Sequence, residues 1–183
     1  MKDYKISLAG DLGSGKSTVG AMLSQKYGLE KVSIGQIQRQ MASDMNMTTI
    51  EFNRYMETHP EFDDVLDGKL REYENMHGRY IFDSRLAWHF VPSSFKVYMV
   101  VDVKTAAERI MNANRSGEQF SSIEDGIEKI LSRRGSETLR YKTMYNVDIT
   151  DMSNYDLVVV TDGKTPNEVA SEISNAFENW LKN

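Results

Sequence analysis

The chain has 183 residues, of which 40% are hydrophobic and 27% are charged, and its formal net charge at pH 7 is −5. This length fits one domain with a buried core, and the acidic balance argues against a nucleic-acid polymer as partner, which would need a basic surface. There is no cysteine, which excludes disulfides and thiolate metal sites. No apolar run approaches the roughly 20 residues that span a bilayer, and the first residues do not resemble a leader. We therefore expect a cytoplasmic protein with no membrane partner.

The first half of the chain alternates apolar runs with helical patterns. In chain order these predict a strand over residues 5–9, a helix over 16–27, a short strand over 31–33, helices over 36–45, 49–58 and 62–76, and a buried strand over 80–83. Gly28 ends the first helix, and His59-Pro60 stops the third.

The second half continues the alternation with a strand over 96–102, helices over 104–114 and 122–145, a strand over 156–161 and a last helix over 166–182. Ser121 or Ser122, followed by Glu124 and Asp125, is typical of a helix start. Strands alternating with helices predict an α/β fold whose parallel sheet is covered on both faces. We expect one domain over residues 1–183, with helical insertions over 35–76 and 115–146 at the edge of the sheet where ligands bind.

An eight-residue run fits a phosphate-binding motif at every fixed position. Gly10-Asp11-Leu12-Gly13-Ser14-Gly15-Lys16-Ser17 matches G-x-x-x-x-G-K-[ST], follows an apolar strand and opens a helix. Its amides and the helix N-terminus would point at a phosphate chain, Lys16 would reach the β- and γ-phosphates, and Ser17 would offer its hydroxyl to Mg²⁺. The motif predicts ATP binding by Gly10, Leu12, Gly13, Ser14, Gly15, Lys16, Ser17 and Thr18.

Asp83 is the second candidate metal ligand, because it ends a buried strand that would lie beside the phosphate-binding loop. A plain turn aspartate is the alternative. A GTPase would carry an N-K-x-D guanine motif, and the chain has none: Thr161-Asp162-Gly163-Lys164 has the right location and the wrong pattern.

Arginines supply the candidate acceptor site. A kinase of a small anionic molecule needs convergent arginines to bind the acceptor and neutralise the transferring group. Arg39 follows Gly35 inside the first insertion, and Arg85 lies two residues beyond a strand end. We expect both arginines to bind the acceptor's phosphate. The alternative for either one is that it only forms a salt bridge at the surface.

A second arginine pair lies on the long helix. Arg133 and Arg140 are seven residues apart, so they share one face, and Glu137 between them is placed to orient both. We expect these two arginines to act on the transferring phosphoryl group. A solvated charged face is the alternative.

Taken together, these runs resemble the archaeal-type cytidylate (CMP) kinases. The resemblance covers residues 4–161 and is carried by residues 10–17, 33–39, 50–55, 59–61, 84–86, 108–110, 133–141 and 145–157. It implies a P-loop kinase fold with a five-stranded parallel core, an acceptor-binding insertion over 35–76 that includes Gly35, and a lid over 115–146. It also implies Mg·ATP as donor, with Arg109 on the donor side, and CMP or dCMP as acceptor.

The chain departs from the family pattern at several positions. Arginines usual on the helix before the lid are replaced by Ala106 and Ala113, and we expect Arg115, on the following loop, to substitute for the donor-side arginine missing near position 113 when the lid closes over ATP. A solvated Arg115 is the alternative. The other departures are Gln36 for an acid, Gln38 for an aromatic residue, Asp83-Ser84 for Glu-Gly and Arg134 for an acid.

The favoured function is transfer of the γ-phosphoryl group of ATP to a nucleoside monophosphate. An ionised phosphate is already a nucleophile, so positioning and charge neutralisation by Lys16, Arg133, Arg140 and Mg²⁺ suffice without a general base. Two alternatives stay open: a kinase of a hydroxyl-bearing metabolite with Asp83 as base, and a module that senses nucleotides without turnover. The sequence does not indicate an oligomeric state.

Overall fold

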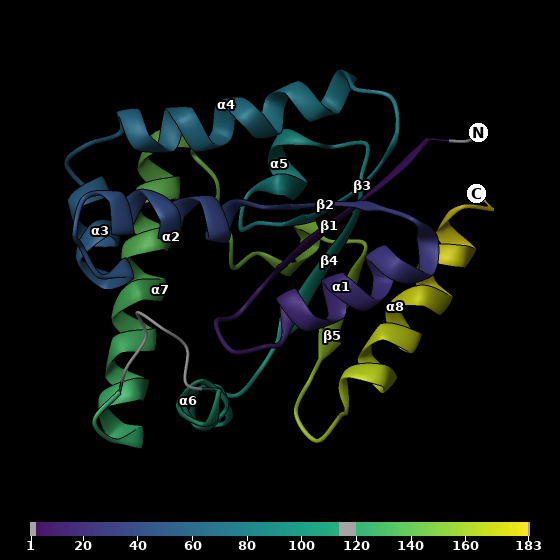
Figure 1. Cartoon of the computed structure of the whole chain (residues 1–183). Helices are drawn as coiled ribbons and strands as arrows, with labels where there is room; N and C mark the ends of the chain where they lie inside the picture. Colours follow the sequence, from purple (N-terminus) through teal and green to yellow (C-terminus); the bar gives the residue numbers. More distant parts are fainter. Residues whose placement is uncertain (1–2, 114–119, 183) are drawn as a thin grey trace.

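Five parallel strands form the sheet at the centre of the molecule (Figure 1). The structure is a computed structural model that describes residues 3–113 and 120–182. In the order in which they pair, the strands are β2 (Glu30–Ser33), β3 (Arg79–Asp83), β1 (Tyr4–Gly10), β4 (Phe95–Val100) and β5 (Leu157–Val160). The predicted α/β class and five-stranded parallel sheet are confirmed.

Two apolar layers enclose the sheet. Helices α1 (Lys16–Tyr27) and α8 (Pro166–Trp180) cover one face, where Leu23 and Phe177 pack against Ile6 of the central strand. Helices α4 (Glu61–Asn75) and α5 (Ala87–Phe90) cover the other face, with Leu70 and Phe82 in the same apolar group (Figure 1). Because β1 is buried between these layers, the loop that follows it is anchored at the middle of the sheet.

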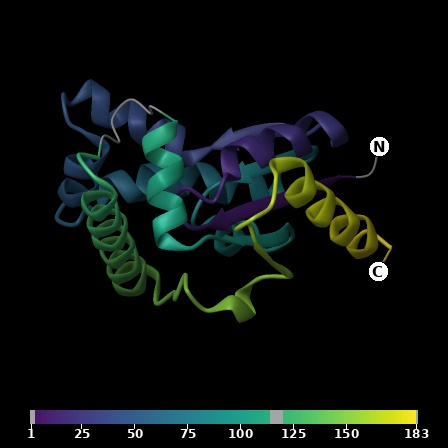
Figure 2. The ribbon, with the colours of Figure 1, turned by 90° about the horizontal axis from the view of Figure 1, so that it is seen from below.

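The remaining helices frame the carboxyl edge of the sheet. Helices α2 (Ile34–Asp44) and α3 (Thr49–Met56) join α4 between β2 and β3, within the expected insertion. Helix α6 (Val103–Asn112) lies beside the long α7 (Ile123–Tyr145), as Figures 1 and 2 show, and Ala107, Ile110 and Ile130 pack between them. A short 3₁₀ helix, η1, spans Met152–Asn154. No helix in the described ranges is long and apolar enough to cross a membrane.

The predicted elements differ from the structure at one strand end and in lacking the short helices α5 and η1, for local reasons. The strand predicted over 96–102 ends at Val100, because Asp102 caps α6 by accepting hydrogen bonds from the backbone N–H groups of Lys104 and Thr105. Helix α5 was not predicted, since a single turn shows no helical periodicity in sequence. The other boundaries agree within two residues. Ser122 caps α7, as expected, by accepting from the N–H of Asp125.

Gly10 is required where β1 meets β4. Its φ is +138°, and a Cβ there would lie 2.3 Å from the carbonyl oxygen of Met99. We expect Gly10→Ala to lower the free energy of unfolding by about 3 kcal/mol or more, because backbone strain and overlap with the next strand add. Gly28 also has a positive φ, +62°, but a Cβ there meets no heavy atom within 4 Å. Gly28→Ala should therefore cost only about 1 kcal/mol. Urea unfolding compares the two, and equal losses would contradict this packing.

Candidate active site

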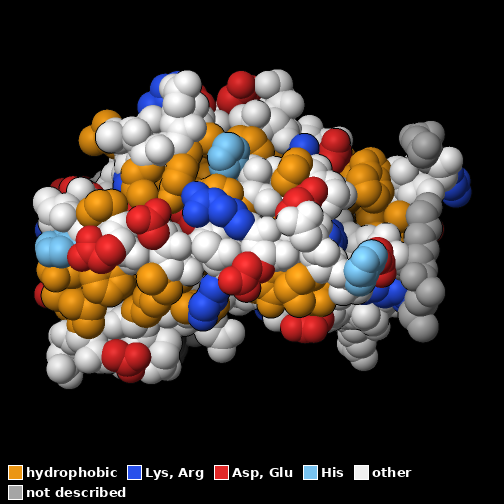
Figure 3. Space-filling view, turned by 90° about the horizontal axis from the view of Figure 1, so that it is seen from above, with side chains coloured by type: hydrophobic (Ala, Val, Ile, Leu, Met, Phe, Trp, Pro, Cys, Tyr) orange, Lys and Arg blue, Asp and Glu red, His pale blue; other side chains and the backbone are white. Residues whose placement is uncertain are grey.

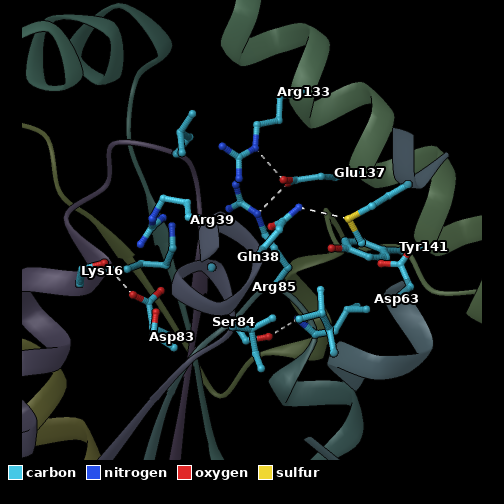
Figure 4. Close-up of a pocket in the computed structure, with 18 of the residues that line it drawn as sticks. Lys16, Gln38, Arg39, Asp63, Asp83, Ser84, Arg85, Arg133, Glu137 and Tyr141 are labelled. Atoms are coloured by element: carbon cyan, nitrogen blue, oxygen red, sulfur yellow. Dashed lines mark hydrogen bonds and ion pairs between the residues drawn. The ribbon is translucent and has the colours of Figure 1, made fainter. Parts of the chain in front are cut away.

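An open cleft lies at the carboxyl edge of the sheet, between the phosphate-binding loop, the α2–α4 segment and α7. Figure 4 shows Lys16 and Asp83 at one end, Asp63 and Tyr141 at the other, and charged side chains of α7 between them. Outside the cleft, on the face above α4, basic side chains are interspersed with acidic and apolar ones (Figure 3). The convergent positive charge is therefore a property of the cleft and not of that face.

Lys16 is folded back onto its own loop. Its Nζ donates to the carbonyl oxygens of Gly10 at 2.8 Å and Asp11 at 2.7 Å. Burial, together with the nearby charge of Arg85, lowers the pKa of Lys16 to about 7. A phosphate chain entering the loop would supply the negative charge that this ammonium group lacks.

The two candidate metal ligands are in direct contact. Ser17 Oγ donates to Asp83 Oδ2 at 2.6 Å. The two residues are close because Asp83 ends β3, and Ser17 lies in the segment that follows the neighbouring strand β1. Mg²⁺ keeps several waters and commonly takes only one or two protein oxygens besides substrate phosphates. This hard-oxygen pair fits that requirement. The described ranges hold no group of three or more His, Cys, Asp or Glu that could bind a metal without a substrate.

Glu137 forms ion pairs with two arginines at the centre of the cleft. Its carboxylate accepts from Nε of Arg85 at 2.7 Å and from Nε of Arg133 at 2.9 Å, and its side chain is only 3% exposed. Burial alone would raise the pKa of Glu137, but the charges of Arg85 and Arg133 outweigh it and lower the pKa to about 2. Arg85 also donates from Nη1 to the Gly10 carbonyl, which connects α7 to the phosphate-binding loop.

The expected partnership of Glu137 with Arg140 is corrected by these contacts. Arg85 takes that place, and Arg140 turns toward the α2–α4 segment. Arg140 Nε lies 3.0 Å from Asp63 Oδ2, and its Nη1 donates to the backbone and side-chain oxygens of Asn53, both at 3.3 Å. Its role in transfer stays a prediction.

The remaining acceptor candidates line the same cleft. Arg39 is exposed on α2 and borders the cleft together with Gly35 and Arg85. A Cβ on Gly35 would lie 3.6 Å from Arg39 Nη1, so the two positions are adjacent. The structure thus brings together the three residues expected to bind the acceptor.

A second pocket opens on the other side of the phosphate-binding loop, lined by Gly13, Thr18, Arg109, Lys164 and Pro166 among others. Arg109 is fixed there by donating from Nη1 to Thr161 Oγ1 at 3.0 Å and from Nη2 to Thr161 O at 2.8 Å. Sequence reasoning did not select Thr161 or Lys164, although their place after the last strand was a usable signal. Arg115 lies outside the described residues.

Asp11 is a further residue that sequence reasoning missed. Its carboxylate accepts from Tyr98 OH at 3.0 Å and from the Val101 N–H at 3.1 Å, and it forms an ion pair with Arg134 of α7 at 3.4 Å. The motif treats this position as variable, so it carried no signal. The contacts give α7 a second connection to the loop that holds Lys16.

The Glu137 assignment predicts a pH-dependent loss of stability in Glu137→Gln. The variant leaves two arginines without their buried counterion, so we expect a loss of about 3 kcal/mol at pH 7. Since the folded pKa lies below the ordinary value of 4.5, this stabilisation is complete above about pH 4.5 and declines as the pH falls toward 2. At pH 3.5 the difference from wild type should be about 1 kcal/mol smaller. Urea unfolding at the two pH values measures it.

The matched control is Glu128→Gln, which removes the same charge from an exposed position of α7. It should change stability by no more than about 0.5 kcal/mol. A small loss of unfolding free energy in Glu137→Gln, or a loss that is the same at pH 7 and pH 3.5, would contradict an ionised Glu137 that stabilises the two arginines.

Comparison with known proteins indicates the family to which this chain belongs. The family described as AAA domain (AAA_18) matches residues 6–130. A cytidylate kinase of Thermoplasma volcanium is 38% identical over 179 residues, covering 95% of this chain and 91% of that protein. An S-adenosylmethionine-dependent nucleotide dehydratase of Lacinutrix mariniflava is 38% identical over 176 residues, covering 95% of this chain and 36% of that protein. The chain thus spans about a third of the second relative's length.

The fold has solved counterparts. A shikimate kinase from Bacteroides thetaiotaomicron superimposes with a TM-score of 0.66 over 97% of this chain and 99% of that one, at 13% sequence identity. Identity this low supports the fold alone. The family rests on the Thermoplasma cytidylate kinase, 91% of whose length is covered, and on the AAA-domain match, which together show that the chain belongs to the cytidylate kinase family of P-loop kinases.

Proposed function

We propose that this protein transfers the γ-phosphoryl group of ATP to CMP or dCMP, forming ADP and CDP or dCDP. The observation that carries the proposal is a single cleft that joins Lys16 to the arginines assembled on Glu137. A donor's phosphate chain and an acceptor's phosphate could therefore meet in one space. The Thermoplasma relative, named a cytidylate kinase over nearly its whole length, supports the choice of acceptor.

The donor would occupy the phosphate-binding loop and the pocket beside it. Its base would lie near Arg109 and Thr161, and its phosphates along the loop toward Lys16. Ser17 and Asp83 would hold Mg²⁺, which neutralises charge on the β- and γ-phosphates when bound. Lys16 would exchange its two carbonyl partners for phosphate oxygens.

The acceptor's phosphate would lie between Arg39, Arg85 and Arg133. One of its ionised oxygens attacks the γ-phosphorus in line; the new O–P bond forms as the bond to the β–γ bridging oxygen breaks, and ADP leaves. Lys16 and Arg133 neutralise the charge on the transferring oxygens. Arg140 reaches the same cleft from its contacts with Asp63 and Asn53.

A phosphate acceptor suits this site better than a hydroxyl acceptor. A hydroxyl group would need a base, and Asp83 is the carboxylate that could serve. Its Oδ2 accepts the Ser17 hydroxyl at the position proposed for the metal. An ionised phosphate needs no such base.

Acceptor preference is the first test of the proposed function. We expect CMP to be phosphorylated with the highest kcat/KM, dCMP or UMP to follow, and AMP and GMP to be poor. Coupled measurement of ADP formation across these nucleotides and a set of sugar acids checks the order. A protein that prefers AMP, GMP or a hydroxyl compound is not a cytidylate kinase, and nucleotide binding without transfer would identify the sensing alternative.

Lys16→Met tests the phosphoryl-transfer assignment. The ammonium group should matter most where charge develops on the transferring oxygens, so we expect kcat to fall by about 100-fold or more. Lys26→Met is the matched control, because Lys26 lies exposed on the same helix and pairs with Glu178. It should keep the wild-type kcat. If Lys16→Met kept kcat within a few-fold of wild type, Lys16 would not act in transfer.

A further inference from the structure

The first variable residue of the phosphate-binding loop, Asp11, is tied to strand β4 through both its backbone and its side chain. Its N–H donates to Met99 O at 2.9 Å, and its carboxylate accepts from Tyr98 OH at 3.0 Å and from the Val101 N–H at 3.1 Å. The carbonyl oxygen of Asp11 in turn accepts from Lys16 Nζ at 2.7 Å. The contacts of Asp11 with β4 therefore fix the position of an atom that holds Lys16.

The same carboxylate is where α7 meets the loop. Nη1 of Arg134 lies 3.4 Å from Asp11 Oδ1, and the side chain of Arg134 is 47% exposed whereas that of Asp11 is 12% exposed. An ion pair this open to solvent adds little to folding stability, because water and salt screen it. It can still fix how the two elements lie relative to each other.

A second contact on this side of α7 is formed by Glu137, which binds Arg85 beyond the end of β3. One contact leaves a helix free to roll about its axis, and a second contact on a neighbouring position of the helix removes that freedom. Arg134 lies three residues before Glu137, so the two are neighbours on the helix surface. Together they set the roll of α7 against the loop.

The roll of α7 decides where Arg133 points. Arg133 directly precedes Arg134, pairs with Glu137 at 2.9 Å and borders two spaces: the cleft, and a smaller pocket behind the loop that Asp11 also lines. Its long side chain enlarges any rotation of the helix at the guanidinium group. A small roll would therefore carry that group from the cleft toward the second pocket, away from the proposed path of the phosphates.

We propose that Asp11 and Arg134 are positioning residues for phosphoryl transfer: Asp11 fixes the carbonyl group that holds Lys16, and Arg134, paired with Asp11, keeps Arg133 directed at the transferring phosphoryl group. The inference rests on the proposed function, because it concerns the same transfer. Neither residue touches substrate, and both act through the cations beside them. Misplacing such a group by about 1 Å can cost ~100-fold in rate, so a pair that adds little to stability can matter for kcat.

Arg134→Gln separates this role from a structural one. We expect kcat to fall by ~10-fold, the KM for ATP and for CMP to change by less than ~3-fold, and Tm to stay within about 2 °C of wild type. Arg134→Lys keeps a charge that can reach Asp11 and should restore most of kcat. Because salt screens the pair, the advantage of wild type over Arg134→Gln should shrink to ~3-fold or less in about 1 M salt.

Asp11→Asn completes a double-mutant cycle. Asparagine can still accept from the Val101 N–H, and the Tyr98 hydroxyl can turn to accept from its amide, so the variant removes the charge and keeps the ties to β4. We expect kcat to fall by ~10-fold here too. The double variant Asp11→Asn/Arg134→Gln should lie within ~3-fold of either single variant, whereas independent effects would multiply to ~100-fold.

Lys142→Gln is the matched control, because it removes a positive charge from an exposed position of the same helix and should keep the wild-type kcat. If both single variants keep kcat within ~2-fold of wild type, if KM rises in place of the fall in kcat, or if the two effects multiply in the double variant, the positioning role is overturned and the proposed function stands. A wild-type protein that transfers no phosphoryl group to CMP would refute the proposed function and this inference together.

Discussion

A buried carboxylate keeps the positive charges of the cleft assembled. Cations that must converge on phosphate repel one another when no phosphate is bound, and packing them together costs free energy unless a counterion is built in. Glu137 supplies that counterion to Arg85 and Arg133, and Arg85 reaches on to the Gly10 carbonyl. The phosphate-binding loop, the end of β3 and α7 are thereby held in one arrangement without a ligand.

The order of the strands makes this arrangement possible. Because β1 lies between β3 and β4, the phosphate-binding loop leaves the sheet beside Asp83 and Arg85, and the Ser17–Asp83 contact follows directly. Helix α7 then crosses the open edge and contacts both the loop, through Arg134, and the α2–α4 segment, through Arg140. Any movement of α7 would therefore change both the loop and the α2–α4 segment, the two sides of the cleft proposed for donor and acceptor.

The parts of the site that were predictable depend on local pattern. The phosphate-binding motif has fixed spacing, and a strand end next to it could be placed from the alternation of strands and helices, so Asp83 could be expected beside the loop, where it contacts Ser17. Their role as metal ligands stays a prediction. The Arg85–Glu137 pair was not predicted, because its members are 52 residues apart and meet only through the packing of α7. The seven-residue spacing places Arg133 and Arg140 on one face of α7. It does not indicate which residues of other elements contact each arginine.

The buried carboxylates that α4 contributes to the cleft were the least predictable. In sequence, Asp63 and Asp67 belong to a charged stretch that also contains the exposed Asp64, and the pattern is that of a solvated helix face. Only the packing of α4 against α7 shows that two of the three carboxylates are buried. The contacts of Asp11 were not predicted either, because it occupies a motif position that tolerates any residue.

A crystal structure with an analogue that joins adenosine and cytidine through five phosphates tests this cleft most directly. We predict adenine beside Arg109, the phosphates running past Lys16 to Arg85 and Arg133 with Glu137 still bound to both arginines, and the cytidine within the same cleft. A structure in which the cytidine end lies outside the cleft, or in which Arg85 stays on the Gly10 carbonyl without touching phosphate, would contradict the proposed path of transfer.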